Sequence, residues 1–175
     1  MSKDSIALIG FMATGKSTIG KALKNRLGES YLFVETDLIV IEIAGKSIPK
    51  IFAEDGESKF REYEIEACKT VAQLSKVIIS CGGGVVLNQE NVKVLRQFCY
   101  LVLLTATPDV IYNRAMSEGK YNRPVIDKKD PFNEIEKVLQ SREPYYTSAA
   151  EIVIDTSEKP IEAIVDEILQ KTNLS

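Results

Sequence analysis

The eight residues from Gly10 to Ser17, GFMATGKS, fit the pattern GxxxxGK[ST] and constrain this chain more than any other feature. An apolar run at 5–10 precedes them, and Ile19, Leu23 and Leu27 follow on one face of a helix. In this strand–loop–helix context, backbone N–H groups wrap around phosphate oxygens. The segment therefore predicts a nucleotide-binding loop that leads directly from a buried strand into a helix.

Residue types within this loop match the chemistry of a nucleoside triphosphate. Gly10 and Gly15 allow a tightly wrapped backbone, Lys16 is expected to reach the β- and γ-phosphates, and Ser17 offers a hydroxyl to Mg²⁺. We therefore predict ATP as co-substrate and Mg²⁺ as cofactor. The residues predicted to bind ATP in this segment are Ala13, Thr14, Gly15, Lys16, Ser17 and Thr18.

Short apolar runs alternate with amphipathic ones along all 175 residues. Five near-continuous apolar runs predict buried parallel strands at 5–10, 32–35, 77–80, 100–104 and 152–155. Helices are predicted at 16–27, 38–44, 48–54, 56–74, 88–98, 108–116, 133–141 and 144–150, with a last one around 161–169. This alternation predicts one α/β domain, residues 1–175, with three α/β/α layers and ligands at the carboxyl ends of the strands.

Composition excludes several classes of function. The chain has no histidine, which excludes Ser-His-Asp and Cys-His catalysis and histidine-bound zinc. Its 22 basic and 25 acidic residues give a net charge of −3, so we expect no nucleic-acid partner and no attraction to anionic membranes. The three cysteines are far apart in the sequence, which argues against a disulfide framework. No apolar run is long enough to span a membrane. A cytoplasmic location is expected.

Three further segments carry candidate functional groups. Glu35 and Asp37 follow the second strand, and on extended chain residues i and i+2 share a face, so one could serve a metal and the other a substrate hydroxyl. Arg61 and Glu64 lie one turn apart on a predicted helix, and could equally form a solvated pair. Three glycines at 82–84 follow the third strand and permit close approach of a ligand.

Motifs typical of regulatory GTPases, NKxD and DxxG, are absent, which leaves a compact small-molecule kinase. The segments that narrow the family further are GFMATGKST, ETD at 35–37, SIPKIFAEDGESKFREYE at 47–64, CGGGVV at 81–86, NRPVI at 122–126, SREPYYTSAA at 141–150 and VIDT at 153–156. They cover nearly the whole chain. In order and spacing the whole pattern resembles the shikimate kinases, which have the P-loop kinase fold.

This resemblance implies transfer of the γ-phosphate of ATP to the 3-hydroxyl of shikimate, a step toward the aromatic amino acids. It implies a monomer with a mobile lid at about 117–130 and substrate-binding helices at about 38–74. The implied catalytic residues are Lys16, Asp37 and Arg123. The implied substrate-binding residues are Asp37, Arg61, Gly82, Gly83, Gly84 and Arg142. Arg114, Arg123 and Lys159 are implied to contact ATP, and Ser17 and Glu35 the metal.

Some positions depart from the family pattern. Ala13 stands where a glycine is usual, and we expect little effect because the GxxxxGK frame survives. Glu35 replaces a usual aspartate. Tyr145 and Tyr146 are interpreted as packing residues.

Two other functions stay open. Another small-molecule kinase, such as a gluconate kinase, would keep the phosphate loop but need not keep Arg61, the three glycines and Arg142. A nucleotide-dependent binding module without transfer activity would be expected to have lost Lys16, Ser17, Asp37 or the arginines, and none is lost.

Overall fold

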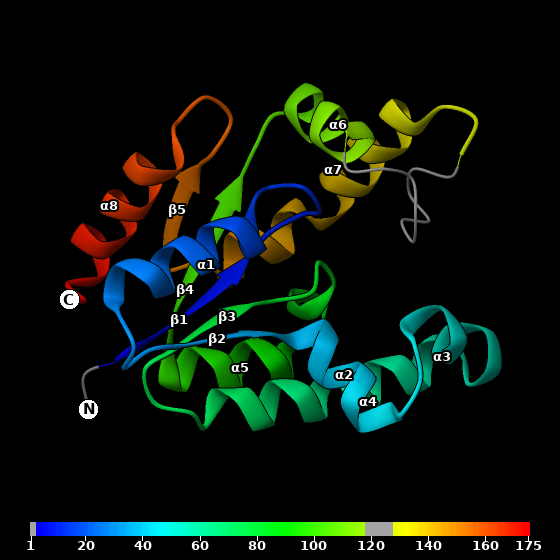
Figure 1. The fold of residues 1–175 in the computed structure, drawn as a ribbon. Coiled ribbons are helices and arrows are strands. Elements are labelled where there is room, and N and C mark those ends of the chain that lie inside the picture. The colour runs from blue at the N-terminus through cyan, green and yellow to red at the C-terminus, as the bar shows by residue number, and fades with distance from the viewer. Residues whose placement is uncertain (1–2, 118–127) are drawn as a thin grey trace.

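The computed structural model describes residues 3–117 and 128–175, and within them one parallel sheet of five strands forms the centre of the protein (Figure 1). The strand order is β2-β3-β1-β4-β5. The strands are β1 (Ser5–Ile9), β2 (Leu32–Glu35), β3 (Val77–Ser80), β4 (Cys99–Thr105) and β5 (Ile152–Asp155). In the register, Leu8 lies opposite Ser80 on one side and Val102 on the other. The predicted five-stranded parallel sheet is confirmed.

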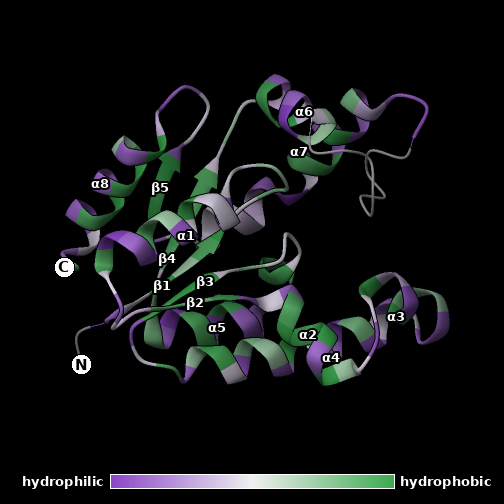
Figure 2. Ribbon diagram, in the orientation of Figure 1, coloured by the Kyte–Doolittle hydropathy of each residue, from purple (hydrophilic) through white to green (hydrophobic). Residues whose placement is uncertain are grey.

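Alternate residues of the central strand β1 point into two separate cores. Ile6 and Leu8 face α1 (Lys16–Leu27) and α8 (Ile161–Thr172). Ala7 and Ile9 face the opposite layer, which is formed by α4 (Gly56–Ala72), α5 (Gln89–Phe98) and α7 (Pro131–Ala149). Figure 2 shows the strands coloured as hydrophobic, whereas the surrounding helices carry both hydrophilic and hydrophobic bands. The predicted α/β/α layering is therefore present.

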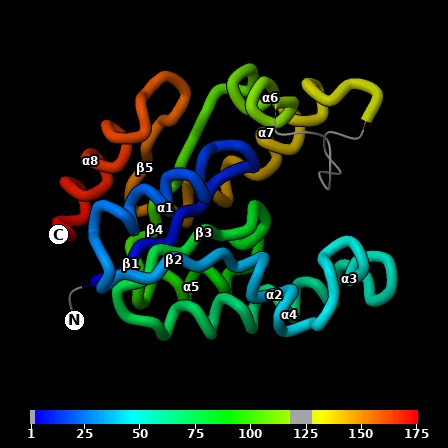
Figure 3. The backbone as a smooth tube through the Cα atoms, viewed as in Figure 1, coloured from blue at the N-terminus to red at the C-terminus, as the bar shows by residue number. Residues whose placement is uncertain are grey.

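Two groups of helices extend past the carboxyl ends of the strands (Figure 3). One contains α2 (Thr36–Ala44), α3 (Ile48–Glu54) and the start of α4, and has its own small core that includes Val40, Ile51 and Phe60. The other contains α6 (Pro108–Ser117) and the start of α7. A 3-10 turn, η1 (Val85–Leu87), follows the glycines after β3.

Two helix predictions are wrong in ways that bear on the site. The helix expected at 38–44 begins at Thr36, so Asp37 lies in its first turn and not on extended chain; an acidic side chain there is favoured by the helix dipole. The two helices expected at 133–141 and 144–150 are one continuous helix, α7, with Pro144 inside it. Buried Ile135 and Ala149 hold both halves against the sheet, and this packing outweighs the tendency of proline to break a helix.

None of the helices in the described ranges is long and apolar enough to cross a bilayer. Most of the predicted lid, residues 118–127, lies outside the described residues.

The junction of β1 with the loop that follows it generates a stability prediction. Gly10 has φ of +143°, and an added Cβ there would overlap the backbone carbonyl oxygen of Leu104. We expect Gly10→Ala to lower the unfolding free energy by about 3 kcal/mol or more, because strain and overlap add. The control is Gly45→Ala, at φ of +65° with no neighbour within 4 Å, which should cost only about 1–2 kcal/mol. Urea denaturation followed by circular dichroism measures both, and equal losses would contradict the assigned overlap.

Candidate active site

The loop between β1 and α1 is held in an unusual backbone conformation. Gly10 and Gly15 have positive φ, and so does Ala13, at +56°. A non-glycine residue adopts this left-handed region at a cost of about 1–2 kcal/mol. The loop therefore keeps its wrapped conformation with alanine at position 13, but the Ala13 backbone is strained. The Thr14 hydroxyl stabilises the turn by donating a hydrogen bond of 2.8 Å to the Phe11 carbonyl.

Charged and polar side chains meet at the start of α1. The Lys16 ammonium donates hydrogen bonds to the carbonyls of Gly10, at 2.8 Å, and Phe11, at 2.7 Å. The Ser17 hydroxyl donates to the Glu35 carboxylate and lies 3.2 Å from the hydroxyl of Ser80. Because α1 begins at Lys16, the positive end of the helix dipole also faces this group of side chains. The arrangement is suited to an anion and a hard cation together.

The glycine loop Gly82–Gly84 brings the remaining predicted groups together. An added Cβ on Gly82 would lie 2.6 Å from an Asp37 carboxylate oxygen, and one on Gly84 would lie 2.5 Å from an Arg61 guanidinium nitrogen. One on Gly83 would lie 3.8 Å from a guanidinium nitrogen of Arg142. Each glycine therefore has one of three charged side chains against it, and two of the glycines leave no room for a side chain.

Asp37 and Arg61 are held by different means. Asp37 lies near Lys16, Glu35 and Arg61, and its pKa is raised above the ordinary value of 3.8, mainly by desolvation, with the two cations opposing the shift. Arg61 donates a 2.9 Å hydrogen bond to Glu64, which is only 2% exposed. The pairing expected at one turn along α4 is therefore a partly buried ion pair rather than a solvated one.

A cleft of about 340 Å³ lies between the phosphate loop and the glycine loop. It joins the carboxyl ends of β1, β2 and β3, where the sheet topology predicts ligand binding. Among the sequence-predicted site residues, those that line it are Ala13, Gly15, Lys16, Ser17, Thr18, Glu35, Asp37, Gly82 and Gly83. Groups expected to serve a nucleotide thus share one cleft with Asp37, Gly82 and Gly83 of the expected acceptor site. The other expected acceptor groups, Arg61, Gly84 and Arg142, do not line it.

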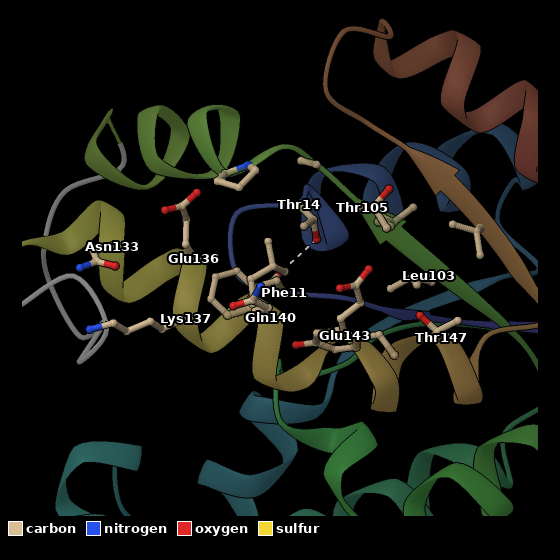
Figure 4. A pocket seen from close by; sticks show the side chains of 16 residues that line it. Phe11, Thr14, Leu103, Thr105, Asn133, Glu136, Lys137, Gln140, Glu143 and Thr147 are labelled. Carbon is tan, nitrogen blue, oxygen red and sulfur yellow. Dashed lines mark hydrogen bonds between the residues drawn. The ribbon is translucent and has the colours of Figure 1, made fainter.

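A larger cavity of about 600 Å³ lies elsewhere, between the end of β4 and α7 (Figure 4). Phe11 and Thr14 from the back of the phosphate loop form one wall, and Glu136 and Glu143 from α7 lie on another. Of the predicted site residues in the described part of the chain, Thr14 alone lines it. We assign the chemistry to the smaller cleft, because that is where Lys16, the carboxylates and the glycine loop meet.

The residues predicted to contact ATP from outside the phosphate loop do not lie together in one group. Arg114 on α6 donates to the carbonyl of Ala13 at 3.3 Å and to the carbonyl of Thr156 at 2.6 Å. The side chain of Lys159 pairs with Glu167 of α8 at 2.5 Å. Arg123 lies outside the described residues.

Two hydroxyl-bearing residues were missed as site residues. The Thr36 hydroxyl accepts a 2.8 Å hydrogen bond from the Gly82 N–H. Tyr146, interpreted from sequence as a packing residue, is buried and donates a 2.6 Å hydrogen bond to the Gly83 carbonyl. Nearness along the chain to a predicted site residue could have identified both. Thr36 precedes Asp37, and Tyr146 lies one helical turn after Arg142.

The raised pKa of Asp37 generates a pH-dependent stability prediction. A carboxylate whose pKa is higher in the folded state costs stability above that pKa, and the cost disappears as the pH falls below the unfolded value. Asp37→Asn should therefore raise the melting temperature at pH 7, and the gain should vanish near pH 4. The control Asp166→Asn removes a surface partner of Arg26 and should lower stability slightly at pH 7. A loss of stability in Asp37→Asn at pH 7 would contradict the prediction.

Comparison with known proteins agrees with this geometry. A sequence model described as shikimate kinase matches residues 12–173. The shikimate kinase of Moorella thermoacetica is 42% identical over 164 residues, covering 94% of this chain and 91% of that protein. The solved shikimate kinase from Acinetobacter baumannii in complex with shikimate has a TM-score of 0.87 at 27% identity, covering 97% of this chain and 92% of that one.

A gluconokinase from Sinorhizobium meliloti 1021 has a TM-score of 0.60 at 16% identity, covering 99% of this chain and 94% of that one, and shows only a shared fold. The family match extends over the cleft-lining residues of the phosphate loop and the glycine loop, and over α7 with Arg142 and Tyr146. This chain belongs to the shikimate kinase family.

Proposed function

We propose that this chain transfers the γ-phosphate of ATP to the 3-hydroxyl of shikimate, forming shikimate 3-phosphate and ADP. The observation that carries the proposal is the glycine loop, which has Asp37, Arg142 and Arg61 against its three successive residues, beside a phosphate loop. A carboxylate and two arginines at this separation suit an acceptor that has a hydroxyl at one end and a carboxylate at the other.

The acceptor end of the site binds the acceptor molecule and orients its reacting hydroxyl. Arg61 and Arg142 each present a planar fork that can hold a carboxylate with two hydrogen bonds. Buried Glu64 anchors one guanidinium nitrogen of Arg61 at 2.9 Å, and the exposed Glu57 pairs with the other at 3.3 Å. An acceptor carboxylate would replace the exposed partner, Glu57. Asp37 then accepts a hydrogen bond from the reacting hydroxyl and aims its oxygen at the phosphate.

The donor end neutralises charge. As the acceptor oxygen bonds to the γ-phosphorus, the bond to the β–γ bridging oxygen breaks and negative charge moves onto ADP. Lys16 and the N–H groups at the start of α1 are placed to stabilise that charge. The transition state of phosphoryl transfer is loose and needs no strong base, so we assign Asp37 mainly to orienting the hydroxyl. The proton of the hydroxyl passes to the Asp37 carboxylate late in the step, as the new O–P bond forms.

Mg²⁺ fits the residues at the start of α1. The Ser17 hydroxyl and the Glu35 carboxylate contact one another, and both are hard oxygen donors of the kind Mg²⁺ prefers. Within the described ranges, no three acidic, histidine or cysteine side chains gather to hold a metal by themselves. The ion would therefore take its other ligands from ATP and water, and when bound it neutralises phosphate charge.

Other assignments extend the proposal. Arg123 would close on the ATP phosphates from a lid at about 117–130, and Arg114 and Lys159 would serve the nucleotide. Residues 1–175 would form one domain, acting as a monomer in the cytoplasm, without nucleic-acid or membrane partners.

Release of ADP from Mg·ATP in a coupled assay tests the proposed function. Shikimate, gluconate and no acceptor are compared side by side, and turnover is expected with shikimate only. The control protein is Asp37→Asn, which keeps the phosphate loop and should bind ATP normally while turnover falls by about a hundredfold or more. Turnover with gluconate, or none with shikimate in a protein that binds ATP, would contradict the proposal.

A second variant tests the acceptor end by itself. Arg61→Ala should raise the KM for shikimate by about tenfold to a hundredfold, because a charged hydrogen-bond partner of the carboxylate is lost, and should leave the KM for ATP nearly unchanged. The matched control is Arg26→Ala, which removes an exposed arginine of α1. Equal increases in both KM values would show instead that Arg61 supports the fold.

A further inference from the structure

The glycine loop that lines the cleft is held from both sides by hydroxyl groups. On one side, the Gly82 N–H donates to the hydroxyl of Thr36, the residue before Asp37. On the other side, the Tyr146 hydroxyl donates to the Gly83 carbonyl at 2.6 Å. Thr36 is fully buried and Tyr146 is 3% exposed. The loop therefore bridges α2 and α7 through two partly buried hydrogen bonds.

Tyr146 also lies beside a second group of the proposed acceptor pocket. Arg142 lies one turn earlier on α7, and four-residue spacing places both side chains on the same helix face. An added Cβ on Gly83 would lie 3.8 Å from a guanidinium nitrogen of Arg142 and 3.9 Å from the Tyr146 hydroxyl oxygen. Burial raises the pKa of the Tyr146 phenol, and the neighbouring Arg142 opposes this shift. The one hydroxyl is thus bonded to the Gly83 carbonyl and adjacent to the Arg142 side chain.

This position distinguishes the hydroxyl from the ring that carries it. The ring belongs to the core beneath α7, where phenylalanine would pack as well. Only the hydroxyl reaches the glycine loop. Tyr145, the neighbouring residue of the same type, is 43% exposed and so offers a natural comparison.

We propose that Tyr146 is a positioning residue, whose hydroxyl fixes the Gly83 carbonyl and the Arg142 guanidinium relative to one another. This inference rests on the proposed function, in which Arg142 binds the carboxylate of the acceptor. With the hydroxyl in place, the guanidinium fork is oriented before the acceptor arrives, and little ordering remains to be done on binding. Without it, the fork loses a fixed neighbour and acceptor affinity falls.

The test is steady-state kinetics of Tyr146→Phe, with Tyr145→Phe as the matched control. Loss of one positioning hydrogen bond should raise the KM for shikimate by about three- to tenfold in Tyr146→Phe. The KM for ATP should stay within about twofold of the parent value, because Tyr146 does not line the cleft at the phosphate loop. Tyr145→Phe should leave both constants unchanged. An unchanged KM for shikimate in Tyr146→Phe overturns the proposal.

A double-mutant cycle with Arg142→Lys separates positioning from general support of the fold. Lysine keeps the charge but lacks the fork that the hydroxyl orients. If Tyr146 acts through Arg142, adding Tyr146→Phe to Arg142→Lys should raise the KM for shikimate by less than it does in the parent protein. An equal increase in both backgrounds overturns the proposal, since it shows independent effects.

Binding of ADP by calorimetry accompanies each variant and shows that the phosphate loop is intact. Activity of the parent protein separates failure of the proposed function from failure of the positioning role alone. If the parent lacks activity with shikimate, the proposed function fails and the positioning role fails with it. If the parent is active and Tyr146→Phe matches it in both KM values, only the positioning role fails.

Discussion

Burial of β1 on both faces is the constraint on which the rest of the structure depends. Its alternate residues enter two cores, so the strand must lie at the centre of the sheet with helices above and below. The loop that follows it, from Gly10 to Ser17, consequently emerges in the middle of the carboxyl edge. The end of β3 lies beside it and the end of β2 lies next to β3, which brings the glycine loop and Glu35 within reach of the phosphate loop.

The proposed acceptor site is built by placing charged side chains directly against backbone. Gly82 and Gly84 leave room for Asp37 and Arg61, and any Cβ there would displace a functional group. The charges are arranged at a cost, since desolvation raises the pKa of Asp37 and also that of Glu64, with neighbouring cations opposing both shifts. Such buried charged groups contribute little to the stability of the fold and are typical of functional sites.

The phosphate loop has a strained backbone that side chains from other elements support. Ala13 adopts a left-handed conformation, and its carbonyl accepts a hydrogen bond from Arg114. The Thr156 hydroxyl donates to the carbonyl of Thr14 at 2.8 Å, and so ties the end of β5 to the same loop. Side chains from α6 and from the residue after β5 thereby hold a backbone conformation that the loop residues would not prefer by themselves.

The sequence by itself determined the strand and helix alternation, the phosphate loop and the family. These follow from local patterns: apolar runs, helical spacing, and motifs whose residues are neighbours along the chain. Tertiary structure alone decided the first turn of α2 around Asp37, the continuity of α7 through Pro144, and the hydrogen bond of Tyr146 to Gly83. The physical reason is distance along the chain. Packing of α7 against the sheet outweighs local preference, and a hydroxyl 63 residues from its acceptor leaves no local pattern to read.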